Sequence, residues 1–125
     1  MTDPILVAGG GIGGLGAALA LARAGFVVRL FERMPEFREL GAGIQLGPNV
    51  FHMFDRLGIR EAIDADAVRP DALVMRCALR GHEITRIPLD GMVARYGNPY
   101  AVTHRADLHA TLLRACQAQP GIGLE

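Results

Sequence analysis

The glycine-rich stretch after the first apolar run constrains this chain more than any other feature. Six of the twelve residues from 5 to 16 (ILVAGGGIGGLG) are glycine. Glycine loses more conformational entropy than any other residue when it becomes ordered, so this density needs a physical reason. We infer that something must come so close to the backbone here that side chains are excluded.

The segments around these glycines predict a βαβ unit. Residues 5–8 form an apolar run typical of a buried parallel strand, and residues 12–24 carry alanine and leucine at helical spacing. Gly25 supplies a stop for the helix, and residues 26–31 (FVVRLF) are β-branched and aromatic, which predicts a second strand. Strand, glycine turn, helix and strand close within about thirty residues, as a βαβ unit does.

The glycines also match a dinucleotide-binding pattern. Gly9, Gly11 and Gly14 satisfy G-x-G-x-x-G between the predicted strand and helix, and Glu32 follows the second strand about twenty residues on. In this pattern the glycines permit a tight turn, the approach of a diphosphate and close packing of helix on strand. The helix start near Gly13 would direct unpaired N–H groups at the phosphates, and Glu32 would accept from the ribose hydroxyls. The pattern fits FAD and NAD alike, whereas an acid at this position would repel the 2′-phosphate of NADP.

The rest of the chain predicts further helices and a hairpin. We expect helices over residues 48–57, 60–67 and 105–117, an antiparallel hairpin from 72–79 and 83–89, an extended piece at 101–104 and a strand beginning at 122. Residues 41–49 (GAGIQLGPN) and 90–100 are expected to be loops. The predicted fold class is α/β, a Rossmann-like βαβ fold with an inserted β-hairpin. It forms one unit over residues 1–125 and is truncated before the sheet is complete.

Composition excludes several partners. The thirteen basic residues, all arginine, balance thirteen acidic ones, so no basic face for nucleic acid is expected. Cys77 and Cys116 stand far apart without a CxxC, which predicts buried or half-buried free thiols in a reducing compartment and no metal site. The N-terminus lacks a basic leader, and the apolar stretch 15–28, interrupted by Arg23, is too short to span a bilayer. We expect a cytoplasmic protein without a membrane partner.

Two blocks of the sequence carry a family resemblance. VAGGGIGGLGAALALARAGFVVRLFERMPEFRELGAGIQLGPNV and RIPLDGMVARYGNPYAVTHRADLHATLL resemble, in order, the N-terminal part of the single-component FAD-dependent aromatic hydroxylases. Within that family they are most similar to the salicylate hydroxylase, 3-hydroxybenzoate 6-hydroxylase and 6-hydroxynicotinate 3-monooxygenase group. The resemblance implies bound FAD, NADH or NADPH as reductant, and hydroxylation of a small aromatic acid. It also implies that the substrate-domain and C-terminal segments lie outside residues 1–125, so that the isolated chain is inactive.

The resemblance extends to single positions. It assigns the diphosphate loop, the ribose ligand, a position along the adenosine and an FAD-contacting arginine to Gly9, Gly11, Gly13, Gly14, Glu32, Arg33 and Arg105. Gln45 would lie near flavin and substrate, and Gly41 and Gly43 would admit the flavin close to the backbone. The similar hydroxynicotinate enzymes carry histidine where this chain has Gln45, which cannot act as a base near neutral pH. That difference favours a salicylate or 3-hydroxybenzoate type of substrate.

Other interpretations of these residues remain open. Arg105 could be a solvated helix start, and Gln45 could serve only the hydrogen bonding of its loop. His52, His82 and His109 are expected to be structural or solvated, and no catalytic residue is assigned. The chain could also be an NAD-dependent Rossmann dehydrogenase, although the hairpin interrupts the alternation of strands and helices, or a truncated product that binds no cofactor.

Overall fold

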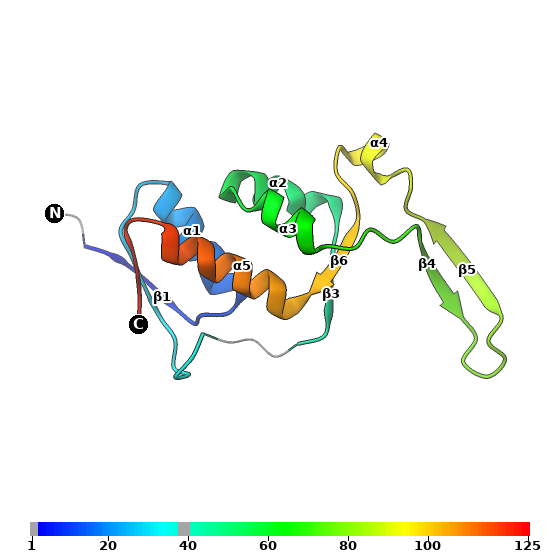
Figure 1. Ribbon diagram of the computed structural model, residues 1–125, viewed down its shortest axis with the longest axis horizontal. Coiled ribbons are helices and arrows are strands. Elements are labelled where there is room, and N and C mark those ends of the chain that lie inside the picture. Colours follow the sequence, from blue (N-terminus) through cyan, green and yellow to red (C-terminus); the bar gives the residue numbers. More distant parts are fainter. Residues whose placement is uncertain (1–2, 38–40) are drawn as a thin grey trace.

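A computed structural model describes residues 3–37 and 41–125 of the chain. The elements in chain order are β1 (Ile5–Ala8), α1 (Ile12–Arg23), β2 (Val28–Phe31), β3 (Gly43–Leu46), α2 (Pro48–Leu57), α3 (Arg60–Asp66), β4 (Ala72–Arg76), β5 (Glu83–Pro88), α4 (Met92–Tyr96), β6 (Ala101–His104), α5 (Arg105–Ala118) and β7 (Ile122–Leu124). The molecule is elongated, with β1 at one end and the β4–β5 hairpin at the other (Figure 1).

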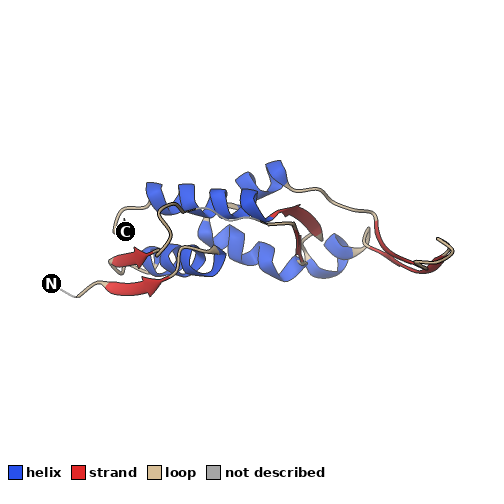
Figure 2. Ribbon diagram, turned by 90° about the horizontal axis from the view of Figure 1, so that it is seen from below, coloured by secondary structure: helices blue, strands red, loops and turns tan. Residues whose placement is uncertain are grey.

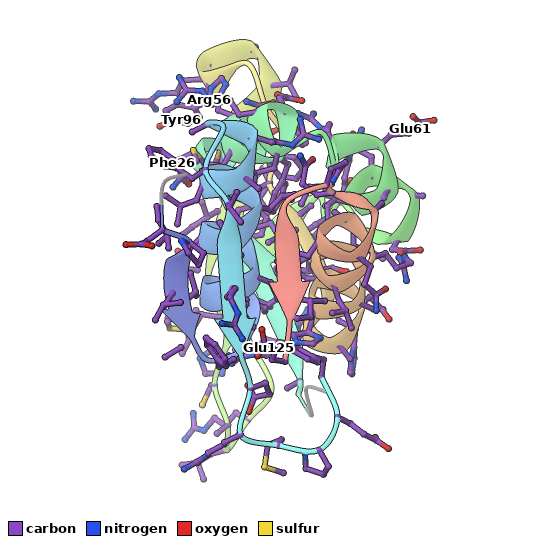
Figure 3. The ribbon with its side chains drawn as sticks, turned by 90° about the vertical axis from the view of Figure 1, so that its left-hand side faces the viewer. Phe26, Arg56, Glu61, Tyr96 and Glu125 are labelled. Carbon is purple, nitrogen blue, oxygen red and sulfur yellow. The ribbon has the colours of Figure 1, made fainter. Side chains whose placement is uncertain are left out.

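Three parallel strands in the order β1-β2-β7 form the sheet from which the glycine-rich segment emerges. Ile5 pairs with Val28 and Val28 with Ile122, so the three strands start in register. Figure 3 faces this end of the molecule and shows the strands side by side. The predicted βαβ unit is confirmed, with α1 as the crossover that parallel strands require. Within residues 3–37 and 41–125, β1 and β7 are the outer strands of this sheet.

The second strand begins two residues later than predicted, for a reason visible at the end of α1. Gly25 adopts a left-handed φ of 93°, and the N–H of Phe26 donates to the carbonyl of Leu21 at 3.1 Å. This bond closes the last turn of the helix. Because the backbone of Phe26 completes the helix, the strand ladder begins at Val28.

Helices α1 and α5 cover one face of the parallel sheet. Side chains alternate along β2, where Val28 and Leu30 are buried and Arg29 and Phe31 are exposed. The core under the helices consists of Leu15, Ala18, Leu19, Val28, Leu30, Leu108, Leu112 and Cys116, with α2 and α3 adding Phe51, Phe54 and Ile63. Burial of a leucine side chain contributes about 1.5–3 kcal/mol, so this packing fixes α1, and with it the glycine-rich turn, against the sheet.

Two segments predicted as loops contain regular structure. Gly43–Leu46 forms β3, which pairs antiparallel with β6 from Gly43↔His104 to Leu46↔Ala101. The short helix α4 lies within residues 90–100. The partner of β3 lies more than fifty residues away in the chain, so local residue preferences could not indicate the pairing.

Arg60 joins α3 to the segment before β6. Its Nη1 donates to Oδ1 of the buried Asn98 at 2.9 Å, and its Nε donates to Asp64 at 2.7 Å. The amide of Asn98 also lies 3.2 Å from the ring of His52 on α2. These contacts hold the two helices beside the strand that leads into α5.

The predicted hairpin is confirmed as β4 and β5, paired antiparallel from Ala72↔Pro88. Figures 1 and 2 both show it extending beyond the helices, away from the parallel sheet. Every residue of β5 is exposed, and Leu79 in the connecting turn is 95% exposed. Among the described residues, no helix is both long enough and apolar enough to cross a bilayer.

Candidate functional site

The turn between β1 and α1 has the geometry that its glycines predict. Gly9 has a φ of 100°, a conformation that favours glycine, and its N–H extends the sheet by donating to Phe31 at 2.8 Å. A Cβ built on Gly14 would overlap the carbonyl oxygen of Gly9. Gly9 therefore makes the turn and Gly14 lets the helix approach the strand, as the sequence predicts.

The amino end of α1 is open in front of Gly11, the remaining glycine of the pattern, and in front of the neighbouring Gly13. A Cβ on Gly11 or Gly13 would meet no atom within 4 Å among the described residues. Gly11 is the N-cap residue of α1, no side-chain hydrogen bond caps the helix, and its first turn carries no acidic residue. The end of a helix with uncapped N–H groups attracts anions, so this geometry fits the diphosphate of a dinucleotide.

Glu32 follows β2 and reaches back to the glycine-rich turn. Its Oε2 accepts from the N–H of Gly10 at 2.6 Å, and its Oε1 accepts from the N–H of Met34 at 3.0 Å. These hydrogen bonds, that of Met34 foremost, lower the pKa of the Glu32 carboxyl below its ordinary value. The carboxylate is thus ionised and oriented, and it retains lone pairs for further donors such as hydroxyl groups.

A pocket of about 660 Å³ lies beside Glu32 at the carboxyl ends of the parallel strands. It is lined by Ala8, Gly9, Phe31, Glu32, Arg33, Met34 and Glu125. Figure 3 shows Glu125 at this end of the strands and Phe26 at the other. Arg29 holds Glu125 through two hydrogen bonds of 2.6 Å each. In open α/β sheets ligands bind at the carboxyl ends of strands, which is where this pocket lies.

Arg105 begins α5 directly after β6, as the sequence predicts. Its backbone N–H donates to the carbonyl of Ala42 at 3.1 Å. A Cβ on Gly41 would come within 2.8 Å of the Arg105 side chain. The side chain that approaches Gly41 closely in this structure is thus that of Arg105. That Gly41 and Gly43 admit a flavin close to the backbone stays a prediction. Contact between Arg105 and a cofactor stays a prediction.

Gln45 lies apart from the Glu32 pocket. It is an exposed residue of β3 and lines a second pocket, of about 370 Å³, together with Ile12 and Gly16 of α1. The structure thus gathers Gly9, Glu32 and Arg33 around one pocket and places Gln45 at another. A role for Gln45 toward flavin or substrate stays a prediction.

Two contacts with the glycine-rich turn were not predicted from the sequence. The ring of Phe37 packs against Gly10, and Nε2 of His109 lies 2.7 Å from the Gly10 carbonyl oxygen. His109 is buried, so of the two expected alternatives, a structural or a solvated histidine, the structure excludes the solvated one. The sequence did contain an indication that His109 lies near the site, because His109 follows Arg105 by four residues and so shares its face of α5.

Comparison with known proteins assigns the chain to a family. The profile of the family described as "FAD binding domain" matches residues 2–120. The chain belongs to this family. The match confirms the resemblance inferred from the two sequence blocks, and it favours FAD over the NAD of the dehydrogenase alternative.

Individual relatives agree with this assignment. 3-Hydroxybenzoate 6-hydroxylase of Polaromonas naphthalenivorans (strain CJ2) is 56% identical over 115 residues, which are 91% of this chain and 29% of that protein. 6-Hydroxynicotinate 3-monooxygenase of Bordetella bronchiseptica is 45% identical over 115 residues, 91% of this chain and 30% of that protein.

A solved structure confirms the fold class. The tetrameric form of 2-methyl-3-hydroxypyridine-5-carboxylic acid oxygenase superimposes with a TM-score of 0.86 at 29% identity, covering 99% of this chain and 31% of that one. The Rossmann-like α/β fold predicted from the sequence is therefore that of known oxygenases. The chain spans about 30% of the length of the relatives that it matches.

Proposed function

We propose that this chain is the FAD-binding segment of an NAD(P)H-dependent monooxygenase that hydroxylates a small phenolic acid. The names of the similar proteins, 3-hydroxybenzoate 6-hydroxylase and 6-hydroxynicotinate 3-monooxygenase, support the reaction class. Because the matched segment is 29% of the first relative, hydroxylation is proposed for a protein that carries this segment. The 125 residues alone are expected to be inactive.

The open amino end of α1 beside the Glu32 pocket is the observation that carries the proposal. In the proposed complex the diphosphate lies over Gly11 and Gly13, where no side chain blocks the helix N–H groups. The adenosine occupies the 660 Å³ pocket, with its ribose hydroxyls donating to Glu32 and with Arg33 alongside. Gly9 and Gly14 shape the turn that brings these groups together.

The remaining assignments concern the flavin and the ring. Arg105 is proposed to contact FAD, and Gln45 to lie toward the flavin and substrate as a hydrogen-bonding group that is not a base. When bound, FAD supplies the redox chemistry that transfers one oxygen atom from O₂ to the ring, with NADH or NADPH as the source of electrons. We propose a substrate of the salicylate or 3-hydroxybenzoate type. The free thiols of Cys77 and Cys116 fit a reducing cytoplasm.

Flavin binding by two matched alanine variants tests the proposal. A Cβ meets nothing within 4 Å at either Gly13 or Gly91, so both variants should fold. Gly13→Ala places its methyl group in front of the helix end and should raise the FAD dissociation constant at least about tenfold. Gly91→Ala, at the start of α4 and away from the parallel sheet, should leave it unchanged. Equal FAD affinity of the two variants, or no perturbation of flavin absorption and fluorescence by a folded wild-type chain, would contradict the proposal.

A further inference from the structure

The carbonyl group of Gly10 lies against a buried side chain of α5. Gly10 is buried, whereas Gly9 and Gly11 on either side of it are exposed. The Gly10 oxygen lies 2.7 Å from Nε2 of His109, a residue of α5 that is only 3% exposed. A side chain from the far end of the chain therefore contacts the turn from inside the fold.

The chemistry of the two groups fixes the direction of this hydrogen bond. A carbonyl oxygen only accepts, so Nε2 of His109 must carry the proton whether the imidazole is neutral or charged. A substitution that removes this donor would leave the buried Gly10 carbonyl without its partner, which is costly in the interior of a protein.

Gly10 is held at three points. His109 binds its carbonyl oxygen, Glu32 accepts from its N–H at 2.6 Å, and the ring of Phe37 lies where a Cβ of residue 10 would be. Both polar groups of the residue are thus engaged by side chains from different parts of the fold. The peptide planes on either side of Gly10 have little freedom to turn.

The orientation of one peptide follows from this arrangement. A trans peptide is planar, and its C=O and N–H point in opposite directions. No cis peptide bond occurs among the described residues, so the carbonyl of Gly10 and the N–H of Gly11 belong to such a peptide. Because the carbonyl of Gly10 faces the buried His109, the N–H of Gly11 points away from His109, and Gly11 itself is exposed.

We propose that His109 is a positioning residue for the diphosphate of the cofactor. By donating to the Gly10 carbonyl, it turns the N–H of Gly11 toward the open side of the loop, where a phosphate oxygen would accept from it. The inference rests on the proposed FAD site and adds to it a residue that contacts the loop and not the ligand. If the Gly10–Gly11 peptide flipped, the carbonyl oxygen of Gly10 would face the diphosphate, and its partial negative charge would repel the phosphate oxygens.

Three variants of the 125-residue chain separate this role from a purely structural one. His109→Gln keeps an N–H donor at a similar reach, and His109→Met replaces the donor by an apolar side chain of similar size. Cys116→Ala is the matched control, because it removes another hydrogen bond from α5 to a buried carbonyl, that of Leu15 at 3.3 Å. The measurements are the FAD dissociation constant by flavin fluorescence, urea unfolding without FAD, and the ¹H–¹⁵N resonance of Gly11.

We expect His109→Met to raise the dissociation constant about tenfold and His109→Gln to stay within about threefold of wild type. Cys116→Ala should lose stability yet keep its FAD affinity. The Gly11 resonance should shift in His109→Met and remain in place in His109→Gln.

Three results would overturn the inference. Equal weakening of FAD binding by His109→Met and Cys116→Ala at equal loss of stability would show that His109 acts through stability alone. A folded His109→Gln chain that binds as poorly as His109→Met would refute the role of the donor. An unchanged Gly11 resonance in His109→Met would refute the positioning of the Gly10–Gly11 peptide. This measurement needs no FAD, so it tests the inference even if the wild-type chain fails to bind FAD and the proposed function is thereby refuted.

Discussion

Replacing Gly14 by alanine tests how closely α1 must approach β1. A Cβ at this position would overlap the carbonyl oxygen of Gly9 and come 3.7 Å from the Val7 side chain. The obstacle is backbone, which cannot rotate away as a side chain could, so the helix must shift from the strand. Overpacking of this kind costs about 1–3 kcal/mol. Alanine regains about 1 kcal/mol over glycine within a helix. With a rigid obstacle the cost lies at the upper end, and we expect a net loss of about 2 kcal/mol.

Gly16 provides the comparison within the same helix. A Cβ there meets nothing within 4 Å, so Gly16→Ala should raise the free energy of unfolding by about 0.5–1 kcal/mol. Urea unfolding followed by circular dichroism at 222 nm measures both variants against wild type. The reasoning would be refuted if Gly14→Ala were as stable as Gly16→Ala, because the two substitutions differ only in the atom that the new methyl group meets.

Three further predictions concern single side chains. Hydrogen bonds from backbone N–H groups, foremost that of Met34, lower the pKa of Glu32. The stabilisation by its carboxylate should therefore be fully present above the ordinary glutamate pKa of about 4.3, and it should be lost progressively as pH falls from there through the lowered value. NMR titration of the Glu32 side chain measures this, and a midpoint at or above the ordinary value would contradict it. Burial raises the pKa of the Cys116 thiol to about 11, so a thiol reagent at neutral pH should label only Cys77 in the folded chain; equal labelling rates would exclude this packing. Asn98→Ala should reduce stability by about 1–3 kcal/mol, because the buried amide accepts from an arginine, and an unchanged urea midpoint would disprove that role.

The sequence predicts this fold best where its pattern is local. The βαβ unit, the helix from Pro48 ended by Gly58 with a φ of 63°, and the hairpin with Gly81 in its turn at a φ of 70° all follow from glycine positions and short-range periodicity. The pairing of β3 with β6 does not, because its two strands are separated by more than fifty residues. The glycines of residues 41–49 favour a loop on local grounds, and the ladder with β6 overrides that preference.

The candidate site shows the same division. Gly9, Gly14 and Glu32 lie close together in sequence within one supersecondary unit, and their geometry follows from the motif. The contact of His109 with Gly10 joins residues 99 apart, so only the packing of α5 on α1 creates it. Gly41 is a further case in which tertiary packing matters, because a Cβ at this position would collide with the side chain of Arg105 from a helix distant in sequence. Motif spacing predicts which backbone meets the ligand, and tertiary packing determines what holds that backbone in place.

The most direct test of the account is to map FAD binding on the ¹⁵N-labelled chain by NMR. We predict that the largest changes in amide resonances on adding FAD occur at Gly11 and Gly13 and around Glu32, Arg33 and Met34 at the 660 Å³ pocket. Residues of the distant β4–β5 hairpin should not respond and serve as the internal control. Changes confined to other parts of the chain, or none at saturating FAD in a folded sample, would contradict the claim that the glycine-rich turn and Glu32 form the cofactor site.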